Sequence, residues 1–180
     1  PEILRRMSEE EGVAPDIVEE HLSEAVRILS ETTTSKLDQD LRSACLPGAE
    51  ALLDALSTRG CALGLVTGTV GATGKAILRR AGLDGYFSVT AFGDEGTDRL
   101  ELLSLVLDRA ERSLDFDWNH ARLVVVGDSP RDIRAGKAVN GRTVAVATGA
   151  HMPHELGEYD PDYVLMSFSD TEEALRAILV

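Results

Sequence analysis

The spacing of apolar positions changes near residue 45 of the chain. Before this point the segment is mostly polar, and its apolar residues recur at near-helical intervals, as in the run Ile17, Leu22, Val26 and Leu29. Such spacing predicts amphipathic helices. Asp16 stands directly before the run and is a candidate N-cap. The first 45 residues are therefore predicted to form a small helical layer rather than part of a sheet.

Beyond residue 45, short apolar runs alternate with segments of helical periodicity. The predicted strands are CALGLVTG, YFSVTAFG, ARLVVVGDS, RTVAVATG and PDYVLMS, at residues 61–68, 86–93, 121–129, 142–149 and 161–167. The predicted helices are residues 46–60, 71–83, 98–113, 130–141 and 170–180. This alternation predicts an α/β fold, a parallel sheet sandwiched by helices. The continuous run LVVVG is typical of a strand that is covered on both faces.

Polar and glycine residues collect where the predicted strands end. The pairs are Thr67–Gly68, Gly93–Asp94, Asp128–Ser129 and Thr148–Gly149. In open parallel sheets, ligands bind beyond the carboxyl ends of the strands. We therefore expect the functional site at this edge of the sheet.

The segment GDSPRD carries two carboxylates at one of these strand ends. Asp128 ends the strand and Asp132 falls in the first turn of the next helix, so both can face one crevice. Carboxylates beside a loop rich in backbone N–H groups suit Mg²⁺, which takes oxygen ligands and leaves room for phosphate and water. The alternative is structural: Asp128 or Ser129 caps the helix, and Asp132 favours its positive amino end. The complete motif favours the cation, with Asp128 and Asp132 as metal ligands.

The segment LVTGT ends another predicted strand with a hydroxyl group and a glycine. The side chain of Thr67 and the N–H groups of Gly68 and Thr69 precede a helix, which is an arrangement that cradles phosphate. A Thr-Gly turn by itself is more often only a turn. Its position in register with Asp128 on a parallel sheet favours phosphate binding.

Arg99 begins the helix that follows the next strand-end loop. A fixed cation at this place can neutralise a phosphate or a carboxylate. The alternative is a surface arginine beside Asp98 and Glu101. The residues alone leave both interpretations open.

Composition narrows the classes of function. The net charge of the 180 residues is −13, which argues against nucleic acid and anionic membranes as partners. Cys45 and Cys61 lie far apart without CxxC spacing, so neither a disulfide framework nor a zinc site is indicated. No apolar run approaches the roughly 18–20 residues of a membrane span. The absence of a disulfide framework favours the reducing cytoplasm as the location.

Taken together, LVTGT, the cation Arg99 and VVVGDSPRDI, in that order, resemble the motifs of the haloacid dehalogenase-like (HAD) hydrolase superfamily. The resemblance is greatest to phosphoglycolate phosphatase-like members with a helical cap, and it covers the whole chain. It implies that residues 1–45 are part of the cap. Residues 46–180 would then be the Rossmann-like α/β core.

The resemblance also implies roles for individual residues. Thr67, with Gly68 and Thr69, would bind the phosphoryl group. Arg99 would replace the family's usual lysine, with the same charge in a different geometry, and would share catalysis and phosphate binding with Thr67. Asp128 would hold Mg²⁺ with help from Asp132.

One motif of the family has no match in this chain. Its nucleophile lies at the end of an N-terminal strand, in Asp-x-Asp-Gly-Thr, and that strand sits in the middle of the sheet. There are two Asp-x-Asp matches in this chain. Asp115–Asp117 follows a predicted helix and Asp160–Asp162 precedes a predicted strand, so neither ends a strand as the family's motif does. A sheet without its central strand would expose backbone groups and apolar surface. We therefore expect the strand and the nucleophile upstream of residue 1, and the chain alone to be inactive.

The resulting functional hypothesis is Mg²⁺-dependent hydrolysis of a small phosphorylated metabolite through an aspartyl-phosphate intermediate. Phosphomutase chemistry would use the same site. Dehalogenation needs no Mg²⁺, so the acidic pair Asp128 and Asp132 speaks against it. A non-catalytic phosphate-binding α/β module is the alternative from another class. The residues leave the substrate and the oligomeric state open.

Overall fold

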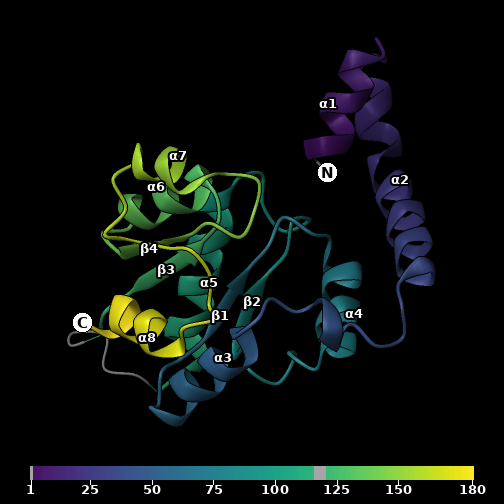
Figure 1. The fold of residues 1–180 in the computed structure, drawn as a ribbon. Coiled ribbons are helices and arrows are strands. Elements are labelled where there is room, and N and C mark those ends of the chain that lie inside the picture. Colours follow the sequence, from purple (N-terminus) through teal and green to yellow (C-terminus); the bar gives the residue numbers. More distant parts are fainter. Residues whose placement is uncertain (1, 116–120) are drawn as a thin grey trace.

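The computed structural model describes residues 2–115 and 121–180 of the chain (Figure 1). Its helices are α1 (Glu2–Glu10), α2 (Pro15–Lys36), the short 3-10 helix η1 (Arg42–Ala44), α3 (Ala49–Thr58), α4 (Gly71–Ala81), α5 (Arg99–Ser113), α6 (Pro130–Ala138), α7 (Pro153–Gly157) and α8 (Thr171–Leu179). Its strands are β1 (Gly64–Val66), β2 (Val89–Ala91), β3 (Val124–Gly127), β4 (Arg142–Val146) and β5 (Tyr163–Leu165). The predicted alternation of strands and helices is confirmed.

All strand pairs in the described residues are parallel, as the sequence predicts, but they form two separate sheets. One sheet pairs β1 with β2, and the other has the order β3-β4-β5. The register sets Val66 beside Ala91 in the first sheet and Val126 beside Val144 in the second. β1 and β3 are therefore each an edge strand.

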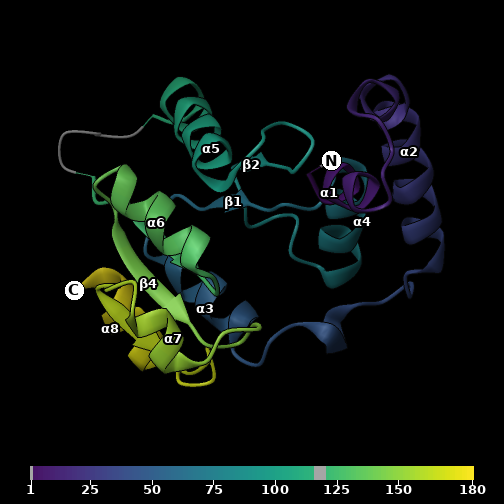
Figure 2. The same ribbon diagram turned by 90° about the horizontal axis from the view of Figure 1, so that it is seen from above.

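Helices cover both faces of the β3-β4-β5 sheet. On one face, Leu52 and Leu56 of α3 and the apolar side of α8 pack around Val144 and Val146. Ala145, which points to the opposite face, packs with Ile133 of α6 and Leu156 of α7. Figure 1 shows the two layers, with α6 and α7 above β4 and α3 and α8 below it, and Figure 2 looks down on them from above. The alternation of side chains along a strand explains how one apolar run serves both cores.

β3 departs from the sequence expectation. The run LVVVG predicts a strand covered on both faces, yet none of its residues from Val124 to Gly127 is buried, and Val126 is 39% exposed. β4, by contrast, has four buried residues. The difference arises because β4 has a neighbour on each side, whereas β3 pairs on one side only.

Helix α2 rests on α4 rather than on a sheet, and α1 packs against α2. The hydroxyl groups of Ser30 and Thr73 are buried and lie 2.8 Å apart, which joins α2 to α4. Arg80 Nη1 donates to the carbonyl groups of Thr34 and Leu37, at 3.0 and 3.2 Å, and so completes the carboxyl end of α2. The predicted helical layer is thus present, and its assignment as part of a cap stays a prediction.

Two local predictions need correction. Asp16 does not cap α2: the N-cap is Ala14, and Pro15 takes the first helical position with Asp16 in the first turn. Proline suits that position because its missing N–H would be unsatisfied there anyway. The short helix α7 was not predicted, since its few residues carry too little periodicity. No helix in the described parts of the chain is long and apolar enough to cross a membrane.

Candidate active site

The strand-end residues singled out in the sequence do converge. Gly93, after β2, lies so close to Gly68, after β1, that a Cβ on Gly93 would be 2.0 Å from the carbonyl oxygen of Gly68. After β4, a Cβ on Gly149 would lie 2.0 Å from Oδ2 of Asp128. The first is an approach of two backbones and requires glycine, whereas the second sets Gly149 against the Asp128 side chain. Both bring the loops of neighbouring strands together at the expected edge.

The turn after β1 is held by its own polar groups. The Thr69 N–H donates to Thr67 Oγ1 at 3.2 Å, and the Thr67 N–H donates to the carbonyl of Ala91 at 3.1 Å. Asp94 caps the following helix, because its Oδ1 accepts from the Gly71 N–H at 2.8 Å. The sequence placed Asp94 at this edge without predicting that contact. One N–H at the amino end of α4 is therefore already occupied by a carboxylate.

The helix after β3 is capped by Ser129, as the structural alternative in the sequence allowed, and Asp132 in the first turn completes the cap. Ser129 is the N-cap of α6, and Ser129 and Asp132 form a capping box. Asp132 Oδ2 accepts from the hydroxyl group of Ser129 at 2.7 Å and from its N–H at 3.2 Å. Asp132 is only 9% exposed. This contact satisfies the amino end of the helix and fixes the loop that begins at Asp128.

Arg99 connects the two sheets rather than pairing with its sequence neighbours. Its Nε lies 2.9 Å from Oδ1 of Asp132, and its Nη1 donates to the carbonyl of Val66 at 3.0 Å. Asp98 instead caps α5 by accepting from the Glu101 N–H at 2.8 Å. The surface-arginine alternative is therefore wrong, and Arg99 places a fixed positive charge between the ends of β1 and β3.

Asp128 is the carboxylate with free capacity at this edge. It is exposed, and no described residue donates a hydrogen bond or forms an ion pair to it, whereas both oxygens of Asp132 are engaged. Within residues 2–115 and 121–180, no three acidic, histidine or cysteine side chains gather into a metal cluster. Mg²⁺ is nevertheless held by as few as one or two protein carboxylates together with phosphate and water. Asp128 fits that requirement by itself.

The Asp-x-Asp matches lie away from this edge. The carboxylate of Asp162 accepts from the N–H and the hydroxyl group of Thr143, at 2.7 and 3.0 Å, which lowers the pKa of Asp162. Asp160 pairs with Lys137 at 3.0 Å. Asp115 follows α5, and Asp117 lies outside the described residues. Asp160 and Asp162 therefore have structural contacts away from the candidate site.

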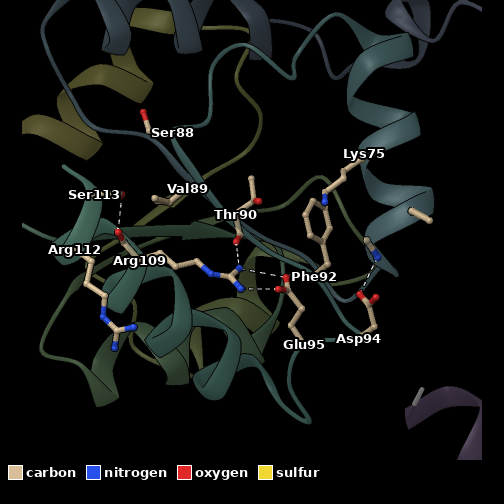
Figure 3. Close-up of a pocket in the computed structure, with 12 residues that line it drawn as sticks. Lys75, Ser88, Val89, Thr90, Phe92, Asp94, Glu95, Arg109, Arg112 and Ser113 are labelled. Atoms are coloured by element: carbon tan, nitrogen blue, oxygen red, sulfur yellow. Dashed lines mark hydrogen bonds and ion pairs between the residues drawn. The ribbon is translucent and has the colours of Figure 1, made fainter. Parts of the chain in front are cut away.

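A cavity of about 820 Å³ lies elsewhere, on the outer side of β2 (Figure 3). Lys75 of α4 lies over the ring of Phe92, and Arg109 of α5 reaches Glu95 at 2.6 Å. Asp128, Arg99 and Thr67 do not line this cavity. Its charged groups are mostly paired with one another, so the edge around Asp128 remains the better candidate site.

The chain is similar to known hydrolases. A family model for haloacid dehalogenase-like hydrolases matches residues 4–140. A phosphoglycolate phosphatase of Synechococcus elongatus is 30% identical over 133 residues, which cover 74% of this chain and 60% of that protein. A probable phosphatase, IndB, of Dickeya dadantii is 25% identical and covers 93% of this chain and 71% of that protein.

Solved structures show the same fold. A putative phosphatase from Clostridium difficile has a TM-score of 0.62 at 25% identity, covering 72% of this chain and 60% of that one. A putative beta-phosphoglucomutase from Thermotoga maritima has a TM-score of 0.62 at 22% identity, covering 98% and 90%. The chain spans between half and two thirds of most of these phosphoglycolate phosphatase relatives. Because the family model matches residues 4–140, the chain belongs to the haloacid dehalogenase-like hydrolase family.

Proposed function

We propose that the full-length protein is a Mg²⁺-dependent hydrolase of a small phosphomonoester that works through an aspartyl-phosphate intermediate. The observation that carries the proposal is the position of Arg99. It contacts the carbonyl that precedes Thr67 and the carboxylate that follows the Asp128 loop. A hydroxyl group, a cation and a free carboxylate thus converge from β1, α5 and β3.

These residues would divide the work on a bound phosphoryl group. The hydroxyl group of Thr67 and the N–H of Gly68 would donate to phosphoryl oxygens, with Thr69 shaping the turn. Arg99 would stabilise negative charge that grows during transfer. Asp128 would hold Mg²⁺, which when bound neutralises phosphate charge. Asp132 would act indirectly, because it orients Arg99 and the Asp128 loop.

The covalent step needs a carboxylate that this chain does not place at the site. In the proposal it comes from an aspartate upstream of residue 1. An oxygen of that carboxylate would attack phosphorus, and the bond to the ester oxygen would break as a second carboxyl group protonates the leaving alcohol. Water would then attack the acyl phosphate, give its proton to the second carboxylate, and release inorganic phosphate.

The names of the relatives suggest which substrates to try. Several are called phosphoglycolate phosphatase, so phosphoglycolate is a suitable first compound beside a generic aryl phosphate. If the product were instead a phosphate moved within or between sugars, the same site would be working as a phosphomutase.

The experiment measures phosphate release by the full-length protein, including any residues that precede residue 1, with and without Mg²⁺. Asp128→Asn is expected to lower kcat/KM by about 100-fold or more, because it removes the carboxylate that holds the cation. Asp160→Asn is the matched control, since Asp160 is an exposed aspartate paired with Lys137 away from the site. Full activity of Asp128→Asn would overturn the metal assignment. Phosphate release by neither protein would favour a binding module.

A further inference from the structure

The cavity on the outer side of β2 has the dimensions of a ligand-binding site. Its volume is about 820 Å³, within the range of roughly 300–1,000 Å³ that is usual for sites that bind small molecules. α4 forms one wall and α5 the other, and β2 with the loop that follows it forms the floor (Figure 3). Thr67, Arg99 and Asp128 lie outside its lining, so this is a place apart from the candidate active site.

The floor of the cavity is largely apolar. Val89 and Phe92 line it and are 8% and 3% exposed, and Ala72 of α4 continues the apolar surface on one wall. The hydroxyl-bearing residues Ser88 and Thr90 complete this part of the lining. An apolar floor with a few polar groups suits the carbon skeleton of an organic molecule better than it suits an inorganic ion.

The charged groups of the lining carry more positive than negative charge. Lys75, Arg109 and Arg112 are the cations, and Asp94 and Glu95 are the carboxylates. This local excess of cations is opposite in sign to the net charge of the whole chain, which is −13. Because a cavity lined by one sign of charge attracts the other, its electrostatics favour an anion.

Both carboxylates of the lining are already engaged by neighbouring groups. Asp94 Oδ1 accepts from the Gly71 N–H at 2.8 Å. Glu95 accepts from the Phe92 N–H at 2.9 Å and pairs with Arg109 at 2.6 Å. Neither carboxylate therefore faces the cavity as a free negative charge that would repel an anion.

The cations are less completely paired than the carboxylates. Arg109 divides its guanidinium group between Glu95 and the carbonyl of Thr90 on the outer edge of β2. Lys75 is exposed, its Nζ lies 5.5 Å from the centroid of the Phe92 ring, and it forms no ion pair within the described residues. The hydrogen bond from Arg109 is the main cause of the lowered pKa of Glu95, and the nearby charge of Lys75 lowers it further. Two cations thus share one carboxylate.

One wall of the cavity is continuous with the turn that follows β1. Asp94 lines the cavity and holds the amino end of α4 through the Gly71 N–H. The neighbouring Gly93 N–H donates to the carbonyl of Thr69 at 2.9 Å. Thr69 belongs to the turn that is proposed to bind the phosphoryl group. A ligand that displaces Asp94 or the first turn of α4 therefore also displaces that turn, because hydrogen bonds connect them.

We propose that this cavity binds a small organic anion, and that the bound anion regulates the site around Thr67. The phosphate or carboxylate group of the ligand would lie between Lys75 and Arg109, which reach toward Phe92 and Glu95 from opposite walls (Figure 3). Its carbon skeleton would lie along the apolar floor. A phosphate ester and a dicarboxylate share this chemistry. Binding stands on the cavity alone, whereas regulation of phosphate release rests on the proposed function.

An NMR titration of the full-length protein with two non-hydrolysable probes tests the site. Phenylphosphonate represents a phosphate ester, and succinate represents a dicarboxylate. We expect at least one probe, at millimolar concentration, to shift the amide signals of Ala72, Lys75, Thr90 and Ser113 until they saturate. The probe that binds more tightly identifies the class of anion. If neither probe shifts these signals, the proposal is overturned.

Lys75→Met, with Arg79→Met as its matched control, tests whether the anion lies in the cavity. Both substitutions remove one positive charge from α4, and Arg79 is exposed and outside the lining. Lys75→Met is expected to weaken binding of the probe about tenfold, because a charge-assisted contact is lost. Arg79→Met should leave the affinity nearly unchanged. Equal affinities of the two variants would overturn the proposal, as would amide shifts confined to residues 67–69 and Asp128.

The effect on turnover is measured with a generic aryl phosphate and the full-length protein. The probe is expected to change kcat/KM by about fivefold. Lys75→Met should abolish this change and leave the basal rate as it is. Inhibition that persists in Lys75→Met would be competition at the site around Thr67 and would overturn the regulatory role.

The two measurements separate this inference from the proposed function. Saturable shifts of the cavity amides without any phosphate release would overturn the hydrolase and leave the anion site standing. Phosphate release without shifts of the cavity amides would do the reverse.

Discussion

The outer edge of β2 and the inner edges of β1 and β3 expose the same kinds of backbone groups, but the side chains around them differ. At the outer edge, Arg109 and Glu95 cover a carbonyl and an N–H and neutralise each other. At the inner edges, valines stand half-exposed beside uncovered N–H groups. Charged groups that cover an edge prevent further pairing, whereas an uncovered apolar edge favours it. The two kinds of edge therefore differ in how their backbone groups are covered in this structure.

The largest expected effect comes from removing the side chain of Arg99, which joins the end of β1 to Asp132 after β3. Arg99→Met leaves Asp132, only 9% exposed, without its cation, and we expect a loss of about 2–3 kcal/mol in the free energy of unfolding. Urea unfolding measures it, with the exposed Arg79→Met of α4 as the control. A loss as small as that of the control would show that Arg99 does not hold the two sheets together.

A smaller effect is expected from a substitution in the loop after β4, beside Asp128. In Gly149→Ala the new Cβ would stand 2.0 Å from Oδ2 of Asp128, so the carboxylate must move. We expect about a tenfold loss in apparent Mg²⁺ affinity of the full-length protein, which corresponds to about 1.4 kcal/mol. Titration of activity against Mg²⁺ concentration measures it.

Gly157→Ala is the matched control for that substitution, because nothing lies within 4 Å of a Cβ at Gly157. Equal Mg²⁺ dependence of the two variants would mean that the position of the Asp128 carboxylate is unimportant for the cation.

Removing the side chain that covers the outer edge of β2 should have a smaller effect on stability. Arg109→Met uncovers the carbonyl of Thr90 and leaves Glu95 unpaired, for which we expect about 1 kcal/mol of destabilisation. It should also increase self-association through β2, measured by light scattering. Arg112→Met is the control, since that side chain is 80% exposed on the same helix. If both variants stay equally monomeric and equally stable, the Arg109–Glu95 pair does not protect the edge.

The smallest effect concerns pH. The hydrogen bond from Arg109 lowers the pKa of Glu95, with a further contribution from the Phe92 N–H. A lowered carboxyl pKa stabilises the fold above the ordinary glutamate pKa of about 4.3, and this stability is lost as pH falls through the lower, folded-state pKa. Melting temperatures of wild type and Glu95→Gln should therefore differ at neutral pH and converge in acid. A constant difference down to low pH would contradict the assignment.

Much of this architecture could be predicted from local pattern. Apolar runs of a few residues, separated by helical periods, were enough for the parallel strands and for the helices between them. The residues at the strand ends indicated where the candidate site lies, because parallel strands bring their carboxyl ends to one edge. Short elements such as α7 and the N-cap of α2 were missed or misplaced, since a single turn contains too few residues for periodicity to register.

Tertiary contacts distinguish the residues of the candidate site from one another. From the sequence, both Asp128 and Asp132 were candidate metal ligands, with Asp132 in a supporting role. The structure separates them, because Ser129 and Arg99 occupy both oxygens of Asp132 and leave Asp128 free. Arg99 had two open interpretations, and only the fold brings Asp132 and the Val66 carbonyl within its reach.

The sequence by itself determined the strand-and-helix order, the edge that carries the polar residues, and the apolar character of β1 and β3, because these depend on residue type and local spacing. Only the tertiary structure decided that the parallel strands divide into two sheets, one of β1 and β2 and one of β3, β4 and β5. Pairing partners are set by contacts between residues far apart in the chain, and apolar runs such as LVVVG specify that a strand needs neighbours without specifying which ones are present.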